Sequence, residues 1–120
     1  MTKTLVKICG ITTAGQAIKM AELGADAIGV ISVEESPRYI PQEKKHEIFK
    51  ILKDLYPNIE RVSVVKNRPI DSIIKNFLDE PNETTIQLHG DEDINYCQKL
   101  KQNIPNVSLW KAFRIKDKKD

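Results

Sequence analysis

The feature that most constrains the fold is a regular alternation between short β-branched runs and longer runs with helical spacing. The β-branched runs predict strands at Leu5–Cys9, Ala27–Ile31, Arg61–Val65, Thr84–Leu88 and Val107–Phe113. The intervening runs predict helices that begin near Thr13, Pro41, Pro69 and Asp91. Because helices separate the strands, the strands should pair in parallel through right-handed crossovers, in the order βαβαβαβαβ.

Two architectures fit this order: a doubly wound open sheet and a stretch of a (β/α)₈ barrel. Both are built from βα repeats with buried strands, so the pattern alone does not separate them. No G-x-G-x-x-G follows the first strand, which weakens a dinucleotide-binding version of the open sheet. In either architecture, ligands gather beyond the carboxyl ends of the strands.

Composition narrows the function classes. A chain of 120 residues with a net charge of +2 fits one globular domain and argues against nucleic acid as a partner. No apolar run approaches the ~20 residues of a membrane span, and the first residues do not resemble a signal peptide. We therefore expect a cytoplasmic protein with no membrane partner, in which Cys9 and Cys97 are free thiols. No cofactor or metal motif is present, and none is expected.

The carboxyl end of each predicted strand, or the loop just after it, supplies a reactive or ionisable side chain: Cys9, Arg38, Lys66, His89 and Lys111. In the stretch VKICGITT, Lys7 and Cys9 share one face of the strand because side chains alternate. A neighbouring ammonium favours a thiolate, which a cysteine base or nucleophile needs. Converging cations would suit an anionic substrate that carries a carboxylate or a phosphate.

Less specific interpretations stay open for the same residues. A strand cysteine is often a small core hydrophobe, and Lys7 could face solvent at a strand edge. Arg38, Lys66 and Lys111 could each be ordinary surface charges. Cys97 lies on the apolar stripe of a predicted helix, so we assign it to packing. Gln87 shares the face of His89, although a histidine before glycine can also be a turn residue. Asp91 and Glu92 are interpreted as charges at a helix N-terminus.

Five short motifs follow one another along the chain: KICGIT (7–12), GADAIG (24–29), SPRYI (36–40), QLHG (87–90) and WKAFRI (110–115). In this order and spacing they resemble one family, the phosphoribosylanthranilate isomerases of tryptophan biosynthesis. The family is a (β/α)₈ barrel that catalyses an Amadori rearrangement of N-(5'-phosphoribosyl)anthranilate to 1-(2-carboxyphenylamino)-1-deoxyribulose 5-phosphate. The resemblance implies a small anionic sugar-phosphate substrate and no cofactor.

The resemblance also implies roles for particular residues. Cys9 would be the general base that removes the proton from C2 of the ring-opened imine. Arg38 would bind near the anthranilate carboxylate, while Gln87, His89 and Lys7 would line the substrate pocket. Val65 and Lys66 depart from the family pattern, because they replace what is usually an apolar wall that contains an aromatic residue.

A (β/α)₈ barrel needs ~200 residues, so we expect residues 1–120 to be the amino-terminal part of one barrel domain, without the remainder. By the resemblance, the missing part holds the general acid and the phosphate-binding loops. We expect the 120 residues to be inactive alone, and either to pair with the missing half or to self-associate. The alternative is a non-catalytic half-barrel that binds an anionic sugar phosphate or a partner protein. A thiol redox module is disfavoured, because no second cysteine lies near Cys9.

Overall fold

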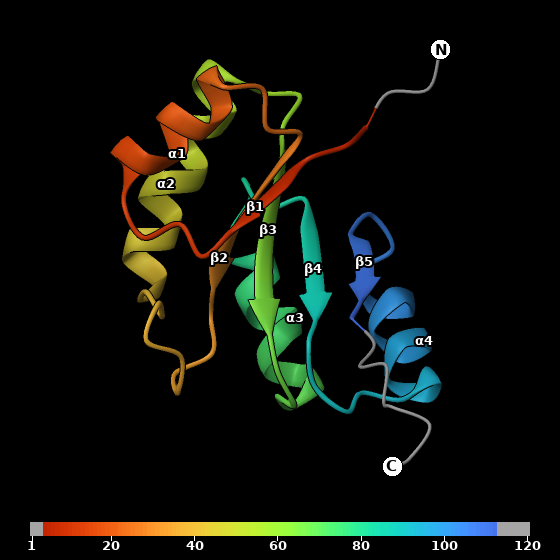
Figure 1. Ribbon diagram of the computed structural model, residues 1–120. Coiled ribbons are helices and arrows are strands. Elements are labelled where there is room, and N and C mark those ends of the chain that lie inside the picture. Colours follow the sequence, from red (N-terminus) through yellow and green to blue (C-terminus); the bar gives the residue numbers. More distant parts are fainter. Residues whose placement is uncertain (1–3, 113–120) are drawn as a thin grey trace, which may run out of the picture.

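The computed structural model describes residues 4–112, which form one five-stranded parallel sheet (Figure 1). The strands lie in chain order and are β1 (Lys7–Cys9), β2 (Ala27–Ile31), β3 (Glu60–Val65), β4 (Thr85–Leu88) and β5 (Ser108–Lys111). The helices between them are α1 (Ala14–Glu22), α2 (Gln42–Leu55), α3 (Ile70–Leu78) and α4 (Ile94–Asn103). A doubly wound sheet would reverse its strand order. The sequential order is therefore that of a partial (β/α)₈ barrel.

The predicted elements are confirmed, with small differences at their ends. Ala27–Ile31 is the strand that the sequence predicts, whereas β1 begins two residues later than predicted, at Lys7. Phe113, the last residue of the fifth predicted strand, lies outside the described residues. Pro41 is the N-cap of α2 rather than its first helical residue. The helix predicted from Asp91 begins at Ile94, because the Asp93 carboxylate accepts a hydrogen bond from Tyr96 N at 2.8 Å and caps it there.

One face of the sheet carries the core. The strand register aligns Ile28 with Ile8 on one side and with Arg61 on the other, so alternate residues of all five strands share this convex face. Two apolar clusters form on it. The first joins β1 and β2 to α1 and α2, and the second joins β3, β4 and β5 to α3 and α4. All four helices therefore cover the same face, which is the arrangement of a barrel wall.

A polar seam separates the two clusters. It runs between α2 and α3 and contains Lys45, Ser63 and Glu83, all of which are buried. Lys45 Nζ lies 3.1 Å from Glu83 Oε1, and the Ser63 hydroxyl donates to the same carboxylate. His46 Nδ1 lies 3.0 Å from Oε1 of the buried Glu80. The two halves of the convex face are thus joined by ionic contacts rather than by continuous apolar packing.

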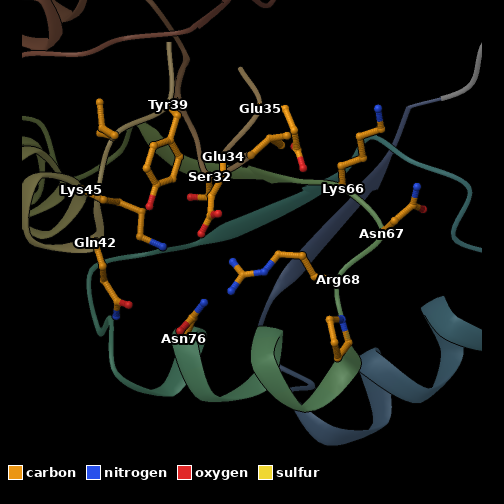
Figure 2. Close-up of a pocket in the computed structure, with 13 residues that line it drawn as sticks. Ser32, Glu34, Glu35, Tyr39, Gln42, Lys45, Lys66, Asn67, Arg68 and Asn76 are labelled. Atoms are coloured by element: carbon orange, nitrogen blue, oxygen red, sulfur yellow. The ribbon is translucent and has the colours of Figure 1, made fainter. Parts of the chain in front are cut away.

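The seam opens outward into a crevice of about 340 Å³ between the loop after β2, the start of α2, the loop after β3 and α3 (Figure 2). Lys45, Arg68 and Asn76 reach into it from three elements. Arg68 Nη2 donates to Ser72 Oγ at 2.7 Å. Among the helices of residues 4–112, none is long and apolar enough to cross a membrane.

Candidate active site on the concave face

The face opposite the helices gathers most of the predicted site residues. Strand register pairs Cys9 with Gly29 and Gln87 with Trp110, so these four residues point to the concave side of the sheet. A Cβ atom added at Gly29 would lie 3.4 Å from Cys9 Sγ and 3.5 Å from Lys7 Cε. Lys7 and Cys9 therefore lie together over Gly29, on the shared face that the sequence predicts.

Lys7 crosses the concave face from β1 to β4. Its Nζ donates to Gln87 Oε1 and lies 5.7 Å from the centroid of the Trp110 ring. In a flat sheet β1 and β4 would be about 14 Å apart, well beyond the reach of a lysine. The contact therefore requires a strongly curved sheet, as in a barrel wall. Burial lowers the pKa of Lys7, and the Coulombic effect of Cys9 opposes that shift.

Cys9 is a partly exposed free thiol at the carboxyl end of β1. Its neighbour Ile8 packs on the convex side against the first apolar cluster, so the Cys9 sulfur is directed away from the helices. Cys97 differs, as predicted. It packs against the second apolar cluster on α4, and burial raises its pKa.

The loop after β2 brings Arg38 to the mouth of β1. Arg38 Nη1 lies 3.5 Å from the carbonyl oxygen of Cys9. A side chain at Gly10 would collide with the Arg38 guanidinium, and Gly10 has a φ of +85°, which other residues rarely adopt. Gly10 therefore allows both the sharp turn after Cys9 and the close approach of Arg38.

His89 follows β4 directly. Its N–H donates to Val65 O at 2.9 Å, which extends the pairing of β3 and β4 by one residue. Alternation along β4 puts Gln87 on the concave face, and His89 continues that alternation at the rim. His89 is exposed and Gln87 is partly buried. The rim thus offers an imidazole and an amide on the side of the sheet that holds Cys9.

Two cations predicted at the strand ends do not join this group. Lys66 is exposed and lines the crevice between α2 and α3 (Figure 2). Lys111 aligns with Leu88 of the second apolar cluster, so it points to the convex side. Its Nζ lies 2.8 Å from Glu92 Oε1. Both residues were predicted as strand-end cations, but their neighbours in the fold direct them elsewhere.

Glu92 is the residue that sequence reasoning misjudged. The sequence predicts a charge at a helix N-terminus that interacts with the helix dipole, but the Glu92 side chain is only 1% exposed and pairs with Lys111. Its Oε2 accepts from Asn67 N at 2.8 Å, and its Oε1 accepts from Gly90 N at 2.9 Å. No local signal shows this role, because two of its partners come from the loop after β3 and from β5.

The arrangement defines a class of site. Cys9, Lys7, Gln87 and Arg38 are linked by neighbouring contacts on or beside the concave face, and His89 follows β4 at the same end of the sheet, where (β/α)₈ enzymes place their active sites. Within residues 4–112, no three His, Cys, Asp or Glu side chains gather as metal ligands would. The chain therefore has the fold of a partial (β/α)₈ barrel, and these side chains stand at the end of the sheet where that fold carries active sites.

Comparison with known proteins identifies the family. The model of the N-(5'-phosphoribosyl)anthranilate (PRA) isomerase family matches residues 6–120, so this chain belongs to that family. The isomerase of Aquifex aeolicus is 45% identical in an alignment 122 residues long. That alignment covers 92% of this chain and 58% of the relative. The chain spans about half the length of the curated relatives it matches.

Solved structures of this family have the same fold as the chain. A phosphoribosyl anthranilate isomerase in complex with reduced 1-(o-carboxyphenylamino)-1-deoxyribulose 5-phosphate superposes with a TM-score of 0.85 at 32% identity. The match covers 98% of this chain and 57% of that one. A structure described as mutually generated monomers of the dimeric Thermotoga maritima enzyme has a TM-score of 0.83 at 32% identity, and that match covers 98% of this chain and 56% of the other. Both likenesses confirm the partial-barrel fold.

Proposed function

We propose that this chain is the amino-terminal part of a phosphoribosylanthranilate isomerase and contributes the general base to its active site. The observation that carries the proposal is the position of Cys9 on the concave face, beside Lys7 and below Arg38. The bound compound of the solved relative is a reduced carboxyphenylamino-deoxyribulose phosphate, an anion that converging cations suit.

The proposed chemistry is an aldose-to-ketose rearrangement. The Cys9 thiolate removes the proton from C2 of the ring-opened, protonated imine; the C2–H electron pair becomes the C1–C2 double bond, and the C1–N π electrons neutralise the nitrogen. The resulting enolamine loses the proton of its C2 hydroxyl and gains a proton at C1, which gives the aminoketose. Arg38 binds the anthranilate carboxylate, and Lys7, Gln87 and His89 line the pocket. The family resemblance assigns the general acid and the phosphate loops to strands six to eight, so the 120 residues are expected to be inactive alone.

The test uses a completed protein, made by extending the reading frame or by supplying the corresponding half of the Aquifex aeolicus relative. The completed protein should isomerise phosphoribosylanthranilate, and Cys9→Ala should lower kcat by about 10²–10⁴-fold, the usual contribution of a general base. Cys97→Ala is the matched control, because that thiol lies on the convex side. Turnover of Cys9→Ala near the control value would contradict the base assignment.

The partner expected for this chain is the missing half of the barrel. Among the described residues, β1 pairs only with β2 and β5 only with β4, so each strand has an unpaired edge. Light scattering should show a one-to-one complex when the carboxy-terminal half is added. A dimer of this chain that binds sugar phosphate without turnover would favour the non-catalytic half-barrel instead. The cytoplasmic location stays a prediction.

A further inference from the structure

Three strand ends are joined at the rim by one carboxylate. Glu92 accepts hydrogen bonds from Asn67 N in the loop after β3, from Gly90 N in the loop after β4, and from Lys111 Nζ on β5. Lys111 Nζ also donates to the carbonyl oxygen of Gly90. Because a carboxylate can accept several hydrogen bonds at once, a single side chain fixes the relative positions of these three segments.

The two loops are also interlocked directly. Asn67 has a φ of 50°, in the left-handed region, and its Oδ1 accepts from Asp91 N at 2.7 Å. A Cβ atom at Gly90 would overlap the Asn67 side chain, so a larger residue there would have to displace that side chain. On the far side of Asn67, Tyr96 Oη donates to Arg68 O at 2.7 Å. The loop after β3 is thus pinned at two adjacent residues.

This network supports a residue of the proposed site. His89 immediately precedes Gly90, and its own N–H is bonded to Val65 O, two residues before Asn67. Both peptide groups that flank the His89–Gly90 turn are therefore tied to β3 or to the loop that follows it. A shift of about 1 Å in a group that contacts substrate is enough to lower turnover strongly.

We propose that Glu92 is a positioning residue, which holds the His89–Gly90 turn against the loop after β3 and so places His89 at the mouth of the barrel. The proposal rests on the proposed isomerase function. It adds an acidic residue on the convex side to a site whose other members face the concave side. Glu92 touches no substrate in this scheme and acts through the backbone that it binds.

The test compares Glu92→Gln with Glu83→Gln in the completed protein. Glutamine cannot accept three hydrogen bonds in the same geometry, because one of its two terminal atoms is a donor. Glu92→Gln should lower kcat by about 10- to 100-fold. Glu83→Gln is the matched control, since Glu83 is an equally buried carboxylate paired with Lys45 but lies before β4, away from the rim. Its kcat should stay within about twofold of the parent value.

A second variant and a second measurement keep the result decisive. Glu92→Asp retains the charge and should recover part of the lost kcat. If Glu92→Gln fails to fold, kcat and the chemical shifts are measured on Glu92→Asp instead. Amide chemical shifts of Asn67, His89 and Gly90 should move in Glu92→Gln and stay in place in Glu83→Gln. Unchanged chemical shifts, or a kcat of Glu92→Gln equal to that of the control, would overturn the proposal.

Inactivity of the unsubstituted completed protein would instead contradict the proposed function. The chemical shifts would still test the position of the His89–Gly90 turn in that case, so the two failures are distinguishable.

Discussion

Two buried lysine–glutamate pairs hold different parts of this molecule. Lys45 and Glu83 lie in the seam between the two apolar clusters, 3.1 Å apart, with side chains 5% and 2% exposed. Lys111 and Glu92 lie at the rim, 2.8 Å apart, with side chains 17% and 1% exposed. The distances are similar and both carboxylates are withdrawn from water, yet their pKa values shift in opposite directions.

The difference comes from what surrounds each carboxylate. Burial raises the pKa of Glu83, and the nearby Lys45 and the Ser63 hydroxyl do not fully offset it. Burial also acts to raise the pKa of Glu92, but the hydrogen bonds from Lys111 and from the N–H groups of Asn67 and Gly90 outweigh it and lower the pKa. Two fixed backbone donors thus make an ionised carboxylate more stable at the rim than in the seam.

The largest expected effect comes from breaking the seam pair. Lys45→Met leaves Glu83 buried beside apolar atoms without its cation, and removal of one partner of a buried ion pair costs about 3–5 kcal/mol. The free energy of unfolding, measured by urea denaturation of the completed protein at pH 7, should fall by that amount. The loss should be smaller at pH 5, because protonation relieves the unpaired charge.

The double variant Lys45→Met/Glu83→Met is the control for that prediction. An apolar pair of similar volume often replaces a buried ion pair with little cost, so most of the lost stability should return. A double variant as unstable as Lys45→Met would show that the seam is held by something other than this charge pair.

A smaller effect is expected from Gly90→Ala at the rim. The new methyl group would overlap the Asn67 side chain, which also bonds Asp91 N, and overpacking of this kind costs about 1–3 kcal/mol. Asn67→Gly removes the overlap and suits the positive φ at that position. In thermal unfolding, the double variant should therefore lose less stability than the sum of the losses of the two single variants. Simple additivity would contradict the interlocked-loop description.

The smallest effect is the pH dependence that distinguishes the two pairs. The lowered pKa of Glu92 adds stability that is present above its unfolded value near 4.5 and is lost as pH falls through the folded pKa. The raised pKa of Glu83 adds stability that is present below 4.5 and is lost as pH rises through the folded pKa. A tenfold difference in proton affinity between the folded and unfolded states corresponds to about 1.4 kcal/mol.

Urea denaturation from pH 3 to pH 7 is the measurement, with each variant compared with the parent chain. The destabilisation caused by Glu92→Gln should shrink as pH falls below about 4.5, and that caused by Glu83→Gln should shrink as pH rises above it. Parallel curves for the two variants would remove the contrast between the seam and the rim.

Much of the concave site could be predicted because it depends on local periodicity. Alternation along a strand puts Lys7 and Cys9 on one face, and the same rule, continued one residue past β4, puts His89 on the side of Gln87. The sequence left the roles of Lys66 and Lys111 open and did not show the partners of Glu92, because the surroundings of these residues come from other segments. Whether a charge at a strand end meets substrate, solvent or a counter-ion depends on contacts that no local pattern encodes.

The sequence by itself determined the βα alternation, the approximate strand positions and the fact that Lys7 and Cys9 share a face, because these follow from the two-residue repeat of a strand and from the residues that start helices. Only the tertiary structure decided that the sheet curves and keeps its helices on one side. It alone also brought Glu92 to Lys111 and Lys45 to Glu83. Those contacts join residues that are distant in the chain, and only the register of the assembled strands sets which of them meet.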